Sequence, residues 1–168
     1  MKPIFAPWRM AYLGQGAVVG CIFCDFPAQG VSDRTLVVLV GRQAFVMLNR
    51  FPYTSGHLMV VPFRHVATPV DLLPEEWAEM GELVQRSIRA LESTYHPQGF
   101  NVGINVGRAA GAGIEDHCHM HVVPRWSGDN NFVPVLAETR VIPEALEVTH
   151  LRLVEAFVKQ DAGEEVRR

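Results

Sequence analysis

The sequence has little of three things that would narrow its class at once: cysteine, net charge and long apolar runs. Three cysteines in 168 residues are too few for a disulfide framework, which indicates a reducing compartment. The formal net charge of -3 gives no general attraction to a phosphate backbone, so we expect no nucleic-acid partner. No apolar run reaches the length of a membrane span, and the first residues lack a signal-peptide core. We therefore expect no membrane partner and a cytoplasmic protein.

What the chain does have is enough apolar residues for one core. Hydrophobic residues make up 48% of it and charged residues 20%, which is typical of an ordinary globular protein. A chain of 168 residues can bury a sizeable core but is short for two domains. We interpret 1–168 as a single domain, with 1–20 as an N-terminal extension and 161–168 as a polar, flexible tail.

The pattern of apolar runs and turn residues predicts an α+β fold. A long helix is expected from Pro74 to Tyr95, and a C-terminal helix is expected to open at Pro143. The apolar stripe of the long helix consists of Trp77, Met80, Val84, Ile88, Leu91 and Tyr95. Strands are expected at about 35–40, 44–48, 57–61, 100–106 and 117–126. Their hairpin-length connections favour an antiparallel sheet of about five strands, with the long helix as a crossover that covers one face.

Three histidines recur at every second position in the stretch that begins at His117. His119 and His121 follow it, with Cys118 and Met120 between them. In a β-strand this period sends the histidines to one face and the apolar residues to the other, so we expect an imidazole-lined face open to a ligand. Imidazoles supply donors, acceptors and a nucleophile that changes charge near neutral pH. A merely polar or metal-binding strand is the alternative interpretation.

This motif, followed by two apolar residues and Pro124-Arg125, resembles the histidine-triad family of nucleotide hydrolases and transferases. The resemblance runs from Cys21 to about Arg125. The Trp8-Arg9-Met10 start, the loop at 49–53 and Trp126 after the motif are most similar to bacterial diadenosine tetraphosphate phosphorylase-like members. The resemblance implies a histidine-triad (HIT)-like α+β fold in a homodimer. It also implies an enzyme that cleaves a phosphoanhydride or phosphoramidate of an adenine nucleotide through a covalent nucleotidyl-histidine.

The resemblance also implies roles for individual residues. His119, the middle histidine, would be the nucleophile, with His121 as a donor to phosphate and His57 as a group that orients or protonates from the neighbouring strand. Asn49 and Asn105 would contact ribose or phosphate. A Gly/Ala-rich turn at 107–113 could bring backbone amides close to an anion.

Two positions bear on the substrate and on the acceptor of the nucleotide. Gly113 stands where many diadenosine polyphosphate hydrolases of the family carry glutamine, so a phosphate-orienting amide is missing. That departure leaves room for inorganic phosphate instead of water as the acceptor. Trp126 could stack on a base or could simply pack.

The spacing Cys21-x-x-Cys24 predicts a second site. Two thiolates so placed can reach one tetrahedral ion, or can form a redox dithiol, or can be small buried hydrophobes. A structural zinc needs two more ligands, and His65 and His117 are the candidates. Some histidine-triad proteins that resemble this chain hold zinc through the matching positions. The first triad histidine would then be structural, and no organic cofactor is expected.

Three further expectations are open at this stage. The chain could bind a nucleotide without turning it over. It could instead be a metal-dependent hydrolase that uses the three triad histidines as zinc ligands. An open edge on a small antiparallel sheet predicts a homodimer through the Pro74–Tyr95 helix and the adjoining strand.

Overall fold

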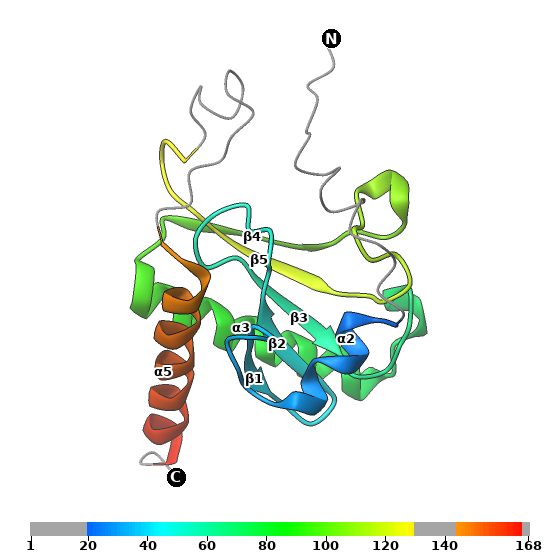
Figure 1. Ribbon diagram of the computed structural model, residues 1–168, viewed down its shortest axis with the longest axis horizontal. Helices are drawn as coiled ribbons and strands as arrows, with labels where there is room; N and C mark the ends of the chain where they lie inside the picture. Colours follow the sequence, from blue (N-terminus) through cyan, green and yellow to red (C-terminus); the bar gives the residue numbers. More distant parts are fainter. Residues whose placement is uncertain (1–19, 130–143, 166–168) are drawn as a thin grey trace.

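The computed structural model describes residues 20–129 and 144–165 and contains a five-stranded sheet (Figure 1). The strand order is β1-β2-β3-β5-β4, and every neighbouring pair is antiparallel. The strands are β1 (Val37–Val40), β2 (Ala44–Leu48), β3 (Leu58–Pro62), β4 (Gly99–Ile104) and β5 (Met120–Arg125). The predicted α+β fold is confirmed, with strand bounds that differ from the prediction by a few residues.

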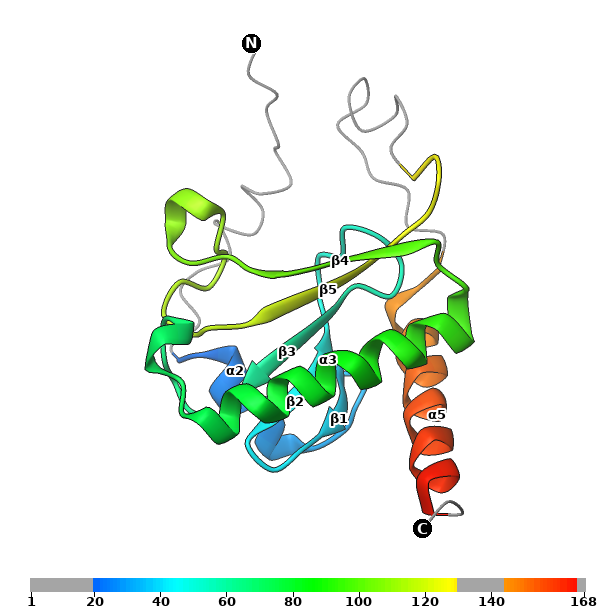
Figure 2. The same cartoon turned by 180° about the vertical axis from the view of Figure 1, so that it is seen from behind.

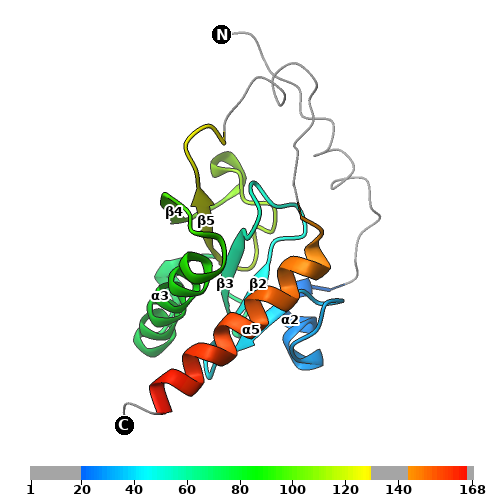
Figure 3. The same ribbon diagram turned by 90° about the vertical axis from the view of Figure 1, so that its left-hand side faces the viewer.

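The two central strands form the middle of the core because every residue in them is apolar. All five residues of β2 and all five of β3 are buried, and the two strands pair in register from Ala44 with Pro62 to Leu48 with Leu58. Strands without a polar face require cover on both sides of the sheet. Helix α3 (Pro74–Tyr95) lies on one side and the short helix α2 (Ile22–Asp25) on the other, as Figure 3 shows.

Helix α3 crosses the sheet, as Figure 2 shows, and five of the six residues of its predicted stripe lie in or against the core, with Trp77 as the exception. Trp77 is 48% exposed, whereas the carboxylate of Glu76 is buried and accepts from the backbone N–H of Leu73 at 2.7 Å. That cap at the first turn points the Glu76 side of the helix at the sheet, about 100° around the axis from Trp77. The buried face is therefore lined by Glu76, Glu79, Met80, Leu83, Ser87, Ala90 and Leu91.

Helix α5 (Leu146–Glu165) packs against β1 and α3 through Leu153 and Phe157, both almost fully buried. The buried His150 donates from Nε2 to the carbonyl of Val37 at 2.8 Å and so joins the helix to the sheet. The helix continues to Glu165, so the first five residues of the expected tail at 161–168 are helical. Neither of the long helices in the described ranges is apolar enough over a sufficient length to cross a membrane.

The triad stretch enters the sheet later than its alternating pattern predicts. Strand β5 begins at Met120, so His121 alone of the three histidines lies in a paired strand, opposite Met59 of β3 and Gly103 of β4. The preceding segment is held by a backbone bond from Cys118 N–H to Val66 O at 2.6 Å. Three 3-10 turns connect the elements: η1 (Pro27–Gln29), η2 (Pro69–Asp71) and η3 (Arg108–Ala110). The predicted extension at 1–20 lies outside the described residues, apart from Gly20. The last helix begins at Leu146, three residues after Pro143, where it was expected to open and which also lies outside the described residues.

Candidate active site and metal centre

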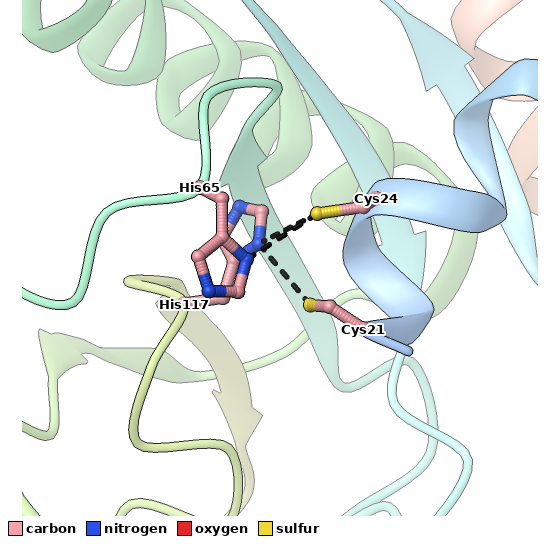
Figure 4. A group of neighbouring side chains, drawn as sticks. All are labelled: Cys21, Cys24, His65 and His117. Carbon is pink, nitrogen blue, oxygen red and sulfur yellow. Dashed lines mark hydrogen bonds between the residues drawn. The ribbon is translucent and has the colours of Figure 1, made fainter. Parts of the chain in front are cut away.

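The four predicted metal ligands come together from three separate parts of the chain. One ligand atom from each of Cys21, Cys24, His65 and His117 lies within 4.8 Å of the others (Figure 4). The Sγ of Cys21 is 3.3 Å from Nδ1 of His117, and the Sγ of Cys24 is 3.3 Å from Nδ1 of His65. Helix α2 supplies the thiols, the loop after β3 supplies His65, and the segment before β5 supplies His117.

The chemistry of these donors fits a tetrahedral zinc ion. Nε2 of His117 donates to the carbonyl of Pro62 at 2.8 Å, so the lone pair of this imidazole is on Nδ1, the atom that faces both thiols. Burial lowers the pKa of His117, which keeps the ring neutral. The pKa of the Cys24 thiol is raised, first by partial burial and then by the Cys21 thiol beside it. A cation reverses that by favouring thiolates, and Cys₂His₂ is a common closed set for structural zinc.

His119 is held so that one particular nitrogen has a free electron pair. Its Nδ1 lies 2.9 Å from the carbonyl oxygen of His117, so Nδ1 carries the proton and donates it. Nε2 is then the unprotonated nitrogen. Burial lowers the pKa of His119, against an opposing effect of the hydrogen bond to His117, so the ring is neutral at neutral pH. A neutral imidazole with a defined lone pair is a competent nucleophile.

His57 and His121 form a hydrogen-bonded pair whose proton positions follow from one backbone contact. The N–H of Tyr53 donates to Nδ1 of His57 at 3.2 Å, so the proton of His57 is on Nε2. That nitrogen lies 3.0 Å from Nδ1 of His121 and donates to it, which leaves the proton of His121 on Nε2. Burial, and then the neighbouring His119, lower the pKa of His121 to about 4.

His119 and His121 therefore offer complementary nitrogens side by side. Their ring centroids are 4.9 Å apart and their planes are almost perpendicular. One ring presents an electron pair on Nε2 and the other an N–H on Nε2. This combination can attack a phosphorus atom and donate a hydrogen bond to the departing group.

The histidine face is not open in the way that the alternation predicts. His57 is fully buried and His119 is 5% exposed. Phe23 of α2 contacts the ring of His119, and Tyr53, from the loop between β2 and β3, lies over His57 with ring centroids 4.6 Å apart. The alternating pattern could not reveal this cover because it comes from segments far from the triad in sequence.

The other four predicted substrate contacts differ from one another in burial and in hydrogen bonding. Asn49 is half-buried and its Oδ1 accepts from Phe51 N–H at 2.9 Å, so this amide shapes its own loop. Asn105 is half-buried just after β4, and Gly113 is exposed in the turn before the triad. Trp126 is half-buried after β5 and donates its backbone N–H to Asp129 at 3.2 Å. Contact of these four with substrate stays a prediction.

The glycine-rich turn offers fewer amides to an anion than its composition indicates. The backbone N–H groups of Ala110, Gly111 and Ala112 donate within the turn, at 3.2, 2.9 and 3.3 Å. The turn is also tied to its exit by Arg108 and Glu115, which are 2.7 Å apart. Internal bonding of this kind makes the turn rigid and reduces the donors that it can turn outward.

The sequence did not single out Phe23 and Tyr53. Phe23 lies between the two cysteines, so the proposed ligation of Cys21 and His117 already requires it to be near the triad. Tyr53 lies four residues before His57 in a short loop. The bidentate pair of Arg125 with Asp129, at 2.5 and 2.8 Å, also went unrecognised; it fixes the turn that carries Trp126.

A three-histidine metal site finds no support in the described part of the chain. The group there that could hold a metal ion includes His117 but neither His119 nor His121. Nδ1 of His119 and Nδ1 of His121 are both already hydrogen-bonded, to a carbonyl and to another imidazole. The geometry thus separates the cysteine-histidine cluster from the His119–His121 pair.

Comparison with known sequences provides evidence that is independent of the geometry. Residues 32–128 match the sequence profile of the HIT domain. An AP-4-A phosphorylase of Mycobacterium tuberculosis is 37% identical over 169 aligned positions, which cover 95% of this chain and 86% of the relative. An uncharacterised HIT-like protein of the same organism is 34% identical over 143 positions, which cover 85% of this chain and 96% of the relative.

Solved structures give the same result for the fold. A Zn-bound histidine triad family protein from Mycobacterium smegmatis superposes with a TM-score of 0.69 at 30% identity, over 88% of this chain and 99% of that one. A hypothetical histidine triad nucleotide-binding protein from Sulfolobus tokodaii superposes with a TM-score of 0.67 at 22% identity, over 83% and 93%. The second likeness concerns the fold alone.

Proposed function

The chain belongs to the histidine triad (HIT) family, and on that premise we propose that it is an enzyme acting on adenine nucleotides of the diadenosine polyphosphate type. It cleaves a phosphoanhydride, or a phosphoramidate in related substrates, through a nucleotidyl-histidine on His119. The observation that carries the proposal is the hydrogen bond from His119 Nδ1 to the His117 carbonyl, because it leaves the Nε2 lone pair for attack.

The first step forms the covalent intermediate. Nε2 of His119 attacks the α-phosphorus, and the bond from that phosphorus to the leaving oxygen or nitrogen breaks. Nε2–H of His121 donates a hydrogen bond to the departing oxygen, which leaves as a phosphate anion, while Nδ1 of His121 keeps the hydrogen bond from His57. A departing nitrogen takes its proton from solvent, and His121 stays neutral throughout. Such transfers depend mainly on positioning and on stabilisation of charge, and the paired rings supply both.

The second step regenerates the enzyme. An acceptor attacks the phosphorus, and the bond from phosphorus to His119 Nε2 breaks, which returns the lone pair to Nε2. A water acceptor releases its proton to solvent, whereas a phosphate anion attacks directly, and Nε2–H of His121 remains a hydrogen-bond donor in both cases. With water as the acceptor the product is AMP, and with inorganic phosphate it is ADP.

Phosphate as the acceptor is the finer proposal. It is supported by the 37% identity to a protein named AP-4-A phosphorylase and by Gly113, which brings no amide side chain to orient water. The test is incubation with diadenosine tetraphosphate, with and without inorganic phosphate, and chromatography of the products. ADP plus ATP only when phosphate is present supports phosphorolysis. AMP plus ATP at the same rate in both reactions supports hydrolysis. If no nucleotide yields any product, the chain is instead a module that binds nucleotides without turning them over.

A structural zinc held by Cys21, Cys24, His65 and His117 is part of the proposal. It is supported by the donor geometry and by the zinc-bound mycobacterial relative. When bound, the ion supplies no reaction chemistry in this scheme. Its ligands join α2, the loop after β3 and the triad segment.

A homodimer through α3 and β4 is also proposed. Strand β4 is at an edge of the sheet, and its residues Asn101 to Gly103 are exposed. Within this strand the side chain of Val102 is 44% exposed, and Trp77 on α3 is 48% exposed. Open edges of this kind are normally paired or covered. Light scattering at micromolar concentration should give twice the mass of the chain, and a monomer would refute the proposal.

All three cysteines are free thiols, which supports the proposal of a reducing, cytoplasmic setting.

A further inference from the structure

We infer that Phe23 is a positioning residue for the nucleophile. Its ring is carried on α2 between the two cysteines of the metal cluster, and it fixes the orientation in which His119 points Nε2 at the substrate. The chemical meaning of that orientation rests on the function proposed above, but the orientation itself can be measured without turnover.

The ring of Phe23 is wedged against two triad histidines at once. It is 1% exposed, and its centroid is 5.0 Å from that of His119 and 5.4 Å from that of His117. The angle to the His117 plane is 81° and the angle to the His119 plane is 53°. The contact with His117 is T-shaped and the contact with His119 is tilted. Aromatic rings favour such inclined contacts at these distances, so Phe23 constrains the plane of His119 as well as filling space.

His119 needs such a contact because its other restraint is incomplete. The bond from Nδ1 to the carbonyl of His117 fixes one atom of the ring and leaves a pivot about that bond. The backbone here lies before β5, which begins at Met120, so no strand ladder holds it. The ring of His121 on β5 packs against His119 with centroids 4.9 Å apart, and Phe23 adds a contact from a separate element, α2, that completes the restraint on the plane of the ring.

The metal cluster explains how a four-residue helix can hold that contact. Helix α2 has no side-chain cap at Cys21, and a helix of one turn is not stable alone. Cys21 is its N-cap residue and Cys24 lies in its single turn, and their sulfurs lie 3.3 Å from Nδ1 of His117 and of His65, respectively. Phe23 lies between these two anchor points. The cluster therefore sets the place of Phe23, and Phe23 sets the place of His119.

The test compares Phe23→Leu with the matched control Ile22→Ala. Leucine keeps a buried apolar side chain but has no ring edge, whereas Ile22 is on the same helix and packs against the core. Three measurements are made on each purified protein: metal content, kcat and KM with diadenosine tetraphosphate, and the ¹⁵N chemical shifts of the His119 ring. Phe23→Leu should keep the metal and its KM within about threefold, and kcat should fall by about ten- to a hundredfold, as for a displaced reacting group.

The ring shifts give the readout that a purely structural role would not move. The parent protein and Ile22→Ala should show one tautomer with the proton on Nδ1, and Phe23→Leu should show an exchanging mixture. Phe23→Tyr, which restores a ring, should recover the single tautomer. Parent-like shifts and kcat in Phe23→Leu would overturn the inference, as would a change that occurs only together with loss of metal. If the parent protein turns over no nucleotide, the proposed function fails but the shifts still decide the role of Phe23.

Discussion

His119 and His121 are the same residue type two positions apart, yet their hydrogen bonds give them opposite chemistry. The carbonyl of His117 takes the Nδ1 proton of His119, whereas His57 donates to Nδ1 of His121. Each remaining Nε2 is therefore assigned, as a lone pair in one ring and as a donor in the other. Main-chain groups and one neighbouring imidazole therefore determine which ring has a lone pair on Nε2 and which has an N–H there.

Replacing His119 with alanine tests its proposed role as the nucleophile. His119→Ala should lower kcat by about three or more orders of magnitude while nucleotide binding persists, since a covalent nucleophile has no substitute. Rapid-quench detection of labelled nucleotide on the protein, together with equilibrium binding, measures both effects. The matched variant His121→Ala should still form the intermediate from a substrate whose leaving group needs no proton. An active His119→Ala beside an inactive His121→Ala would reverse the assignment.

The lowered pKa of His121 predicts that stability falls in mild acid. Its pKa of about 4 is below the ordinary 6.5 of an unfolded histidine, so between these pH values the unfolded state binds the proton and the folded state does not. The contribution is fully present above pH 6.5 and is lost as the pH falls towards 4, and it amounts to at most about 3 kcal/mol. Urea unfolding at pH 7, 5.5 and 4.5 measures it. The parent protein should lose more stability over this range than His121→Gln, and equal losses would contradict the prediction.

The sequence predicted by number the four residues that the structure brings together in the cysteine-histidine cluster. It also singled out His57, His119 and His121, whose catalytic roles stay a prediction. It could not predict the tautomers, because these depend on partners such as the carbonyl of Pro62 and the N–H of Tyr53 that meet the rings only after folding. Phe23 was missed for a related reason. A pattern of period two describes one strand and cannot show what another segment lays over it.

At the scale of elements, apolar patterns predicted the approximate positions of the strands and helices. Local polar contacts determine where β5 begins and which side of α3 faces the sheet. The alternation at 117–121 predicted a strand, but pairing begins at Met120 because the earlier residues turn towards α2 and the loop at Val66. The predicted stripe of α3 was correct for Met80 and Leu91, which are buried, and for Val84, Ile88 and Tyr95, which pack against the core, and it was wrong for Trp77. A buried carboxylate at Glu76 decided which side faces inward, and hydrophobic periodicity takes no account of it.

That carboxylate gives a prediction for stability. Glu76 is 3% exposed, accepts from Leu73 N–H at 2.7 Å, and receives two bonds from Arg64, at 2.9 and 2.7 Å. The bond with Arg64, ahead of an opposing effect of burial, lowers the pKa of Glu76, so it is charged at neutral pH. Glu76→Ala should lower the unfolding free energy by about 1–3 kcal/mol, because the helix loses its cap. The cost is not larger because Arg64 is half-exposed and water can solvate its charge when the carboxylate is gone. Urea unfolding measures this cost, and Glu75→Ala in the same turn, which is exposed, should change stability by less than about 0.5 kcal/mol. Equal effects of the two variants would show that the cap is unimportant.

At the scale of the whole molecule, the metal cluster links parts of the chain that the sheet does not join. Cys21 and Cys24 precede β1, His65 follows β3, and His117 precedes β5. Helix α2 covers one face of the sheet and carries Phe23 to the triad. If a metal occupies this cluster as proposed, we expect its removal to affect both the fold and the orientation of His119.

Metal analysis and metal removal test this coupling. Protein purified without added metal should contain about one zinc per chain, as expected of a closed four-ligand site. Stripping with a strong chelator should lower the thermal midpoint, since an ion that binds only the folded state stabilises it by mass action. Cys24→Ser should prevent tight binding and reproduce that lowered midpoint. Cys118→Ala is the matched control, because Cys118 is a buried free thiol outside the cluster and its loss should leave the zinc content unchanged. Zinc-free protein whose midpoint equals that of protein reloaded with zinc would refute the site, and equal zinc in Cys24→Ser and Cys118→Ala would assign the metal to other residues.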